Sequence, residues 1–112
     1  MGALDVGCEA ILSIEKDVLP LQFVLYQNYP NPFNPVTTLR YNLREDAMVN
    51  LTIYDMMGRQ VSTLVSSEQS AGYKSVQWNA VNDTGAPVSA GLYLYRIRTG
   101  KFVKTLKMVL LK

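Results

Sequence analysis

Oxygen-bearing side chains that could hold a cation gather in one short stretch, at Asn79, Asn82 and Asp83. Carboxylate, amide and carbonyl oxygens are the ligands that calcium takes in proteins. One carboxylate supplies little of the charge that a hard cation needs, and Asn and Asp also stabilise tight turns by bonding nearby backbone. With Gly85 closing the stretch, a turn is the favoured interpretation, and a calcium ion near Asp83 stays open as the alternative.

No set of residues in the sequence is typical of a catalytic centre. The chain has no histidine, and no nucleophile stands beside a plausible general base. The single cysteine, Cys8, cannot form an intrachain disulfide, and without histidine there is no Cys/His metal set. We therefore expect a protein that is not an enzyme and that needs no cofactor.

The charge pattern argues against nucleic acid as a partner. The formal net charge of the 112 residues is +2, which is too weak a field for that role. Residues 96–112 are the exception, because they contain basic side chains and no acid. No run approaches the roughly 18 to 20 apolar residues that cross a bilayer, so we expect no membrane insertion. The first twenty residues carry Asp5, Glu9 and Glu15, so a secretory signal is not expected there.

Apolar and polar residues alternate with period two along most of the chain, a pattern that predicts half-buried strands. Gly-containing turn signals separate the runs at the spacing typical of an all-β sandwich of about seven strands in two antiparallel sheets. The predicted strands are 9–14, 36–43, 48–54, 60–65, 73–79, 91–99 and 102–111, with 22–26 as a candidate eighth. The predicted turns are 55–58, 70–72, 82–85 and 99–101.

Aromatic residues mark the predicted core. Trp78 shares the parity of an apolar strand face and is expected to be its central aromatic. Tyr93 and Tyr95 are expected to be buried, with their hydroxyls bonded to backbone. Leu92 and Leu94 fall on the opposite face, where they would form an exposed patch or a contact between sheets.

Three of the five prolines lie in residues 29–35, YPNPFNP. Proline lacks the backbone N–H and favours an extended residue before it, so this segment cannot be a central strand. It is either a loop that covers one end of the sandwich or a recognition segment. Pro32 to Pro35 also fits a PxxP ligand, but a segment held against a domain is a poor free ligand. Residues 1–21 are interpreted as a linker or the tail of a preceding domain.

Four blocks of sequence resemble the type A C-terminal sorting domain of type IX secretion substrates. The blocks are LYQNYPNPFNPVTTLRYNL at 25–43, YDMMGRQVSTL at 54–64, AGYKSVQWNAVNDTGAPVSAGLYLYRI at 71–97 and KTLKMVLLK at 104–112. The resemblance covers residues 22–112, in order and without large gaps. This chain departs from it at Ala80, where members often carry glycine, and at Leu106-Lys107, where they often carry two lysines.

The resemblance implies an immunoglobulin-like sandwich at the C-terminus of a larger secreted protein. An outer-membrane secretion translocon would read it, and in many members a surface sortase then removes it and attaches the cargo to the cell surface. The expected location is therefore secreted or at the cell surface. A more distant resemblance, to the immunoglobulin-like domain of the flagellar hook-capping protein, implies the alternative of a structural or adhesive module that mediates protein assembly.

The residues that match the family motifs are the candidate recognition residues. The G-R-x-V turn falls on Gly58, Arg59 and Val61. The others form the Pro-rich motif, the G-x-Y motif and the terminal lysine-bearing strand: Pro30, Asn31, Pro32, Phe33, Asn34, Pro35, Gly91, Tyr93, Lys104, Lys107, Met108, Leu110 and Lys112.

The last strand also has a physical reason to be read by a partner. An edge strand presents unpaired backbone groups for strand addition, and lysines on it suppress indiscriminate pairing. A receptor with acidic complementarity would overcome that charge. Exposed edges would equally allow two copies to pair as a homodimer.

Overall fold

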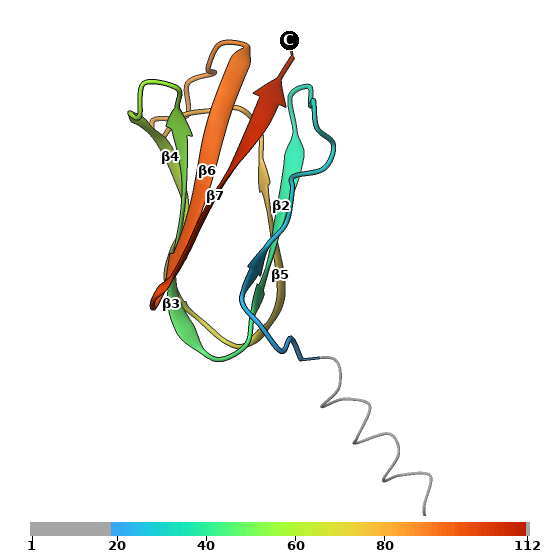
Figure 1. Cartoon of the computed structure of the whole chain (residues 1–112). Coiled ribbons are helices and arrows are strands. Elements are labelled where there is room, and N and C mark those ends of the chain that lie inside the picture. The colour runs from blue at the N-terminus through green and yellow to red at the C-terminus, as the bar shows by residue number, and fades with distance from the viewer. Residues whose placement is uncertain (1–18, 112) are drawn as a thin grey trace, which may run out of the picture.

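The computed structural model describes residues 19–111, which form two antiparallel β-sheets packed face to face (Figure 1). One sheet has the order β1-β2-β5 and the other the order β4-β3-β6-β7. No helix occurs in this part of the chain, so none there could cross a membrane. The strands are β1 (Val24–Leu25), β2 (Thr37–Leu43), β3 (Ala47–Asp55), β4 (Gln60–Gln69), β5 (Gly72–Trp78), β6 (Gly91–Thr99) and β7 (Phe102–Leu110).

The all-β sandwich is confirmed, and the predicted strands 36–43, 48–54, 73–79, 91–99 and 102–111 match the observed bounds to within a residue. The candidate strand at 22–26 exists as the short β1, which brings the described strands to seven. The strand predicted at 9–14 lies outside the described residues. The strand predicted at 60–65 continues to Gln69, because it pairs with β3 as far as Ala47. Its second half is polar since it forms a sheet edge beside water, where alternation is not required.

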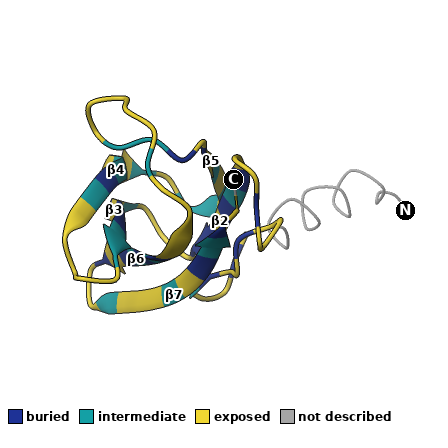
Figure 2. Ribbon diagram, turned by 90° about the horizontal axis from the view of Figure 1, so that it is seen from above, coloured by how far each residue is buried: buried dark blue, intermediate teal, exposed yellow. Residues whose placement is uncertain are grey.

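The core consists of the inward-facing residues of both sheets (Figure 2). Alternate residues of a strand point to one face, so Val49, Leu51 and Ile53 of β3 are all fully buried. Trp78 is buried as predicted, and its indole N–H donates to the carbonyl of Val81 at 2.8 Å. The hydrophobic effect of closing these two faces on each other is the main force holding the fold.

Ala80 carries the unusual backbone that follows Trp78. Its φ is +62°, in the left-handed region that favours glycine, and its methyl group is buried. An L-residue there costs roughly 1–2 kcal/mol. The turn is kept because the Val88 N–H donates to the Ala80 carbonyl and Val81 bridges Pro87. The sequence departure at this position therefore leaves the left-handed backbone in place.

Candidate functional site

The lysine-bearing strand β7 lies at the edge of the four-stranded sheet, next to β6 alone among the strands described. Lys104 and Lys107 are exposed, whereas Met108 and Leu110 are buried. Lys112 lies outside the described residues. Part of the predicted recognition strand is thus accessible to a partner, and its two apolar members belong to the core.

The two described lysines of β7 point to opposite faces. Lys104 pairs with the buried Ile97 of β6, so it has inward parity, yet it is exposed. Lys107 pairs with Leu94, on the outer face of the sheet. A partner that contacts both lysines must therefore approach the edge of the sheet rather than either face.

The Pro-rich segment runs along the outer edge of β7 near its C-terminal end (Figure 1). Phe33 forms a parallel bridge with Leu110. Its N–H donates to the carbonyl of Val109 at 2.9 Å, and its carbonyl accepts from the N–H of Leu111 at 2.8 Å. The segment thus acts as an extra length of strand, which explains why the prolines, lacking N–H groups, flank Phe33 rather than replace it.

Two side chains bond further backbone groups along the same edge of β7, and together with the Pro-rich segment they form what we call the cover. Asn31 Oδ1 accepts a hydrogen bond from the N–H of Val109 at 3.0 Å. Gln27 Nε2 donates to the carbonyl of Lys107 at 2.7 Å. The outer edge of β7 from Lys107 onward is therefore occupied by the chain itself.

Phe33 also anchors the Pro-rich segment in the core. Its side chain is 1% exposed, and its ring lies 5.9 Å from the ring of Trp78. Trp78 in turn meets Tyr93 edge to face at 5.5 Å, an arrangement that aromatic pairs favour. The Tyr93 hydroxyl donates to the carbonyl of Ser89 at 2.6 Å. Phe33 and Tyr93 thus serve as core residues, while Pro30, Asn31, Pro32, Asn34 and Pro35 are exposed.

A buried polar cluster holds the start of the segment, and it joins the predicted backbone bond of the Tyr95 hydroxyl to Asn28, which sequence reasoning missed. The Tyr95 hydroxyl donates to the carbonyl of Tyr26 at 2.7 Å and accepts from the N–H of Asn28 at 2.8 Å. Burial raises the pKa of Tyr95 to about 12, because the ionised hydroxyl would lose its solvation. The buried Asn28 amide donates to Thr37 Oγ1 at 3.0 Å and to the carbonyl of Pro30 at 3.1 Å. No local pattern around Asn28 signals this role.

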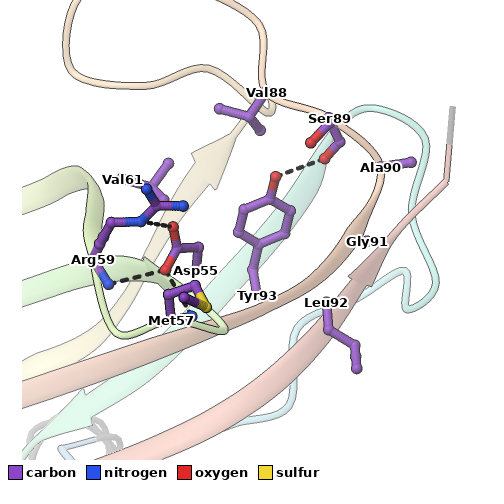
Figure 3. Close-up of a pocket in the computed structure, with 10 residues that line it drawn as sticks. All are labelled: Asp55, Met57, Arg59, Val61, Val88, Ser89, Ala90, Gly91, Leu92 and Tyr93. Atoms are coloured by element: carbon purple, nitrogen blue, oxygen red, sulfur yellow. Dashed lines mark hydrogen bonds and ion pairs between the residues drawn. The ribbon is translucent and has the colours of Figure 1, made fainter.

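The G-R-x-V turn and the G-x-Y motif line one open pocket of about 490 Å³ (Figure 3). The β3–β4 turn contributes Arg59, the start of β4 contributes Val61, and the start of β6 contributes Gly91 and Tyr93. Figure 3 shows Arg59 directed at Asp55 on one wall. Residues thirty or more positions apart in sequence thus meet in one place. Gly91 and Tyr93 pair with the end of β7 and do not lie on its free edge.

The Asp55 carboxylate is occupied by hydrogen bonds within its own turn. Its Oδ1 accepts from the N–H groups of Met57 and Arg59 at 2.9 Å each, and its Oδ2 accepts from Arg59 Nε at 2.9 Å. The hydrogen bond from the Arg59 backbone, followed by those from the Arg59 side chain and Met57, outweighs desolvation and lowers the pKa of Asp55. Gly58, with a φ of +84°, closes the turn in a conformation that glycine accepts readily.

The oxygen-rich stretch near Asp83 is a stabilised turn. Asn82 Oδ1 accepts hydrogen bonds from the Thr84 N–H, the Thr84 hydroxyl and the Ala86 N–H, at 2.7–3.0 Å. Asp83 Oδ1 accepts from the Thr63 N–H at 2.9 Å. These hydrogen bonds are those of an Asx-stabilised turn, the favoured interpretation. Within residues 19–111 no group of three His, Cys, Asp or Glu side chains lies together as a metal site.

Solved structures share this fold. The dimeric latent PorU of Porphyromonas gingivalis aligns with a TM-score of 0.62 at 23% identity, over 80% of this chain and 9% of that one. PorZ of the same organism aligns with 0.54 at 23%, over 79% of this chain and 11% of that one. FlgD of P. aeruginosa aligns with 0.53 at 24%, over 66% of this chain and 57% of that one. The chain therefore spans a small part of PorU and PorZ and about half of FlgD.

The family comparison agrees with the fold. Among curated proteins, none matches the sequence. The family model described as the FlgD Ig-like domain matches residues 35–101, more than half of the chain. That match runs from the end of the Pro-rich segment to the turn before β7. This chain belongs to the FlgD Ig-like domain family.

Proposed function

We propose that this domain is a non-catalytic sorting module, carried at the C-terminal end of a larger exported protein and read by the type IX secretion machinery. Its partners would be the outer-membrane translocon and, where the cargo is attached, a surface sortase. The cargo would be secreted or held at the cell surface. The observation that carries the proposal is the exposed basic edge strand of the sandwich, with Lys104 and Lys107 accessible.

The structural likeness to PorZ also supports a role in type IX secretion. PorZ is an essential bacterial surface component of the type IX secretion system. At 23% identity the likeness shows a shared fold, and the step from that fold to sorting is the proposal. The four sequence blocks that resemble the sorting domain, which include the Pro-rich segment and β7, supply the more specific support.

The experiment fuses residues 19–112 to a periplasmic reporter in a host that has the type IX machinery. Deletion of the last residues would be ambiguous, because it removes the buried Met108 and Leu110 and would unfold the domain. The double variant Lys104→Glu/Lys107→Glu changes two exposed charges instead. We expect surface delivery to fall at least tenfold, whereas Arg40→Glu, an exposed charge on the other sheet, should leave it unchanged. Equal delivery by both variants would refute the proposal.

A second function is favoured by the family itself. Because the chain belongs to the FlgD Ig-like domain family, the alternative is a structural or adhesive module that joins protein subunits. Its experiment is sedimentation of the purified chain, alone and with the protein domain encoded beside it. A stable complex that survives the charge-reversing double variant, together with unchanged delivery of the reporter, would favour assembly over sorting.

A further inference from the structure

The outer edge of β7 is divided into two halves. Both backbone groups of Val109 face away from β6, since they bond Asn31 and Phe33. In an antiparallel ladder alternate residues direct their backbone groups to the same side. Val103 and Thr105 therefore also present their N–H and C=O groups away from β6. No other segment of residues 19–111 bonds them.

This first half of the edge is open to a partner. Val103 is 52% exposed, and Thr105 is exposed as well. Lys104 has inward parity and is nevertheless exposed. The ring of Phe23 stacks on that of Phe102 at 5.8 Å at the start of β7, and within residues 19–111 the outward backbone groups of Val103 and Thr105 stay unbonded. The open half spans Phe102–Leu106, close to the ordinary length of a short strand. An extended peptide could bond there as a fifth strand, by the mode of β-augmentation.

The charge around the open half selects the partner. The β6–β7 hairpin and its turn carry only basic charged residues, and the last acid in the sequence is Asp83. The residues paired with Arg96 and Arg98 on β3 are the neutral Thr52 and Asn50. The basic residues of the hairpin are Arg96, Arg98, Lys101, Lys104 and Lys107.

We infer that the open half of the β7 edge binds an extended, glutamate- or aspartate-bearing segment of another protein. A second copy of this chain would bring like charges opposite each other, which disfavours pairing. The inference rests on the proposed function for its biological setting, because it names the kind of segment with which the secretion machinery would read the domain. It also shifts the reading site from Lys104–Lys112 toward Lys101–Thr105.

The test uses the full 112-residue chain and a synthetic probe. The probe is a capped seven-residue peptide that alternates valine or threonine with glutamate, and its binding is followed by NMR amide exchange. We expect exchange at Val103 and Thr105 to slow at least fivefold with saturating peptide, while exchange at Val109, already bonded to Asn31, changes less than twofold. The same peptide with lysine in place of glutamate should have no effect.

A matched pair of variants tests the backbone contact. Thr105→Pro removes an N–H that faces away from β6, so the β6–β7 ladder is kept. Thr105→Ala loses the hydrogen bond from Arg96 Nε to the hydroxyl but keeps the N–H. We expect peptide affinity to fall at least tenfold in the proline variant and less than threefold in the alanine variant, with both chains folded by their amide spectra.

Three results would overturn the inference. The first is no protection of Val103 and Thr105 at any peptide concentration. The second is equal binding of the glutamate and lysine peptides. The third is protection of both amides in a homodimer without peptide. If the lysine-reversing variant loses surface delivery while the glutamate peptide fails to bind, this inference falls and the sorting proposal stands.

Discussion

The two halves of β7 each carry one lysine and have different environments. In the second half, Met108 and Leu110 are buried, and the free edge is bonded to the Pro-rich segment. In the first half, exposed residues dominate, and no described segment bonds the edge (Figure 2). The difference shows that an edge strand is not uniformly accessible, because a segment distant in sequence decides which backbone groups are free.

The largest expected effect comes from removing the anchor of the covered half. Phe33→Ala should lower the free energy of unfolding by about 3–5 kcal/mol, because it leaves a cavity beside Trp78. Urea denaturation measures the loss, and amide exchange at Val109 should accelerate. Val103→Ala, in the open half, should change stability by less than about 0.5 kcal/mol. Similar losses for both variants would contradict the division of the strand.

The next effect concerns Tyr95, whose hydroxyl connects β6 by hydrogen bonds to Tyr26 and Asn28, just before the Pro-rich segment. Tyr95→Phe should cost about 1–3 kcal/mol at neutral pH, since the N–H of Asn28 loses its acceptor. Because the pKa of Tyr95 in the fold is about 12, above the ordinary 10.0, the neutral hydroxyl stabilises the fold. That stabilisation is complete below pH 10 and is lost as the pH rises from 10 to 12.

Urea denaturation across pH 9–12 checks this sign. Wild-type stability should fall over the upper part of the range, and Tyr95→Phe should fall less steeply. Burial also raises the pKa of Tyr41, so some decline should remain in the Tyr95 variant. A steeper decline in Tyr95→Phe than in the wild type would show that the neutral hydroxyl is not the stabilising form.

A smaller effect tests the cover directly. Asn31→Ala removes the acceptor of the Val109 N–H at an exposed position and should cost about 0.5–1.5 kcal/mol. Exchange of the Val109 amide should accelerate with it. Asn34→Ala is the matched control, because Asn34 makes no hydrogen bond in residues 19–111. Equal exchange rates in the two variants would mean that Asn31 does not hold the edge.

The smallest effect is expected in the open half. Lys104→Glu and Lys107→Glu should each change the free energy of unfolding by less than about 0.5 kcal/mol, because neither lysine forms an ion pair in the described residues. Chemical denaturation of each variant provides the measurement. A loss above about 1 kcal/mol would mean that the lysines support the fold, and reduced surface delivery could then reflect instability.

Much of the fold could be predicted from the sequence because its signals are local. Period-two alternation marks β2, β3, β6 and β7 to within a residue or two. It also predicts the burial of Trp78, Tyr93 and Tyr95. The second half of β4 escapes prediction, since its polar residues follow no pattern and their strand state comes from pairing with β3.

The candidate site was less predictable. The family motifs group all candidate recognition residues together. In the structure some of these residues are exposed, whereas others, such as Phe33 and Met108, belong to the core. Gln27 and Asn28 lie in the first resembling block but are not among the candidate recognition residues, although both hold the Pro-rich segment in place. Their partners lie 80 and 67 residues away along the chain, so no neighbouring residue signals the contact.

From the sequence alone came the two-sheet architecture, the aromatic core and the basic last strand, because side-chain periodicity and composition act within a strand's own length. Tertiary structure decided that the Pro-rich segment occupies the edge beyond Lys107 and leaves Phe102–Leu106 open. Hydrogen bonds between segments far apart in the chain form once the sheets have brought them together. The local sequence pattern does not encode these long-range contacts, and the contacts decide which part of the strand is accessible.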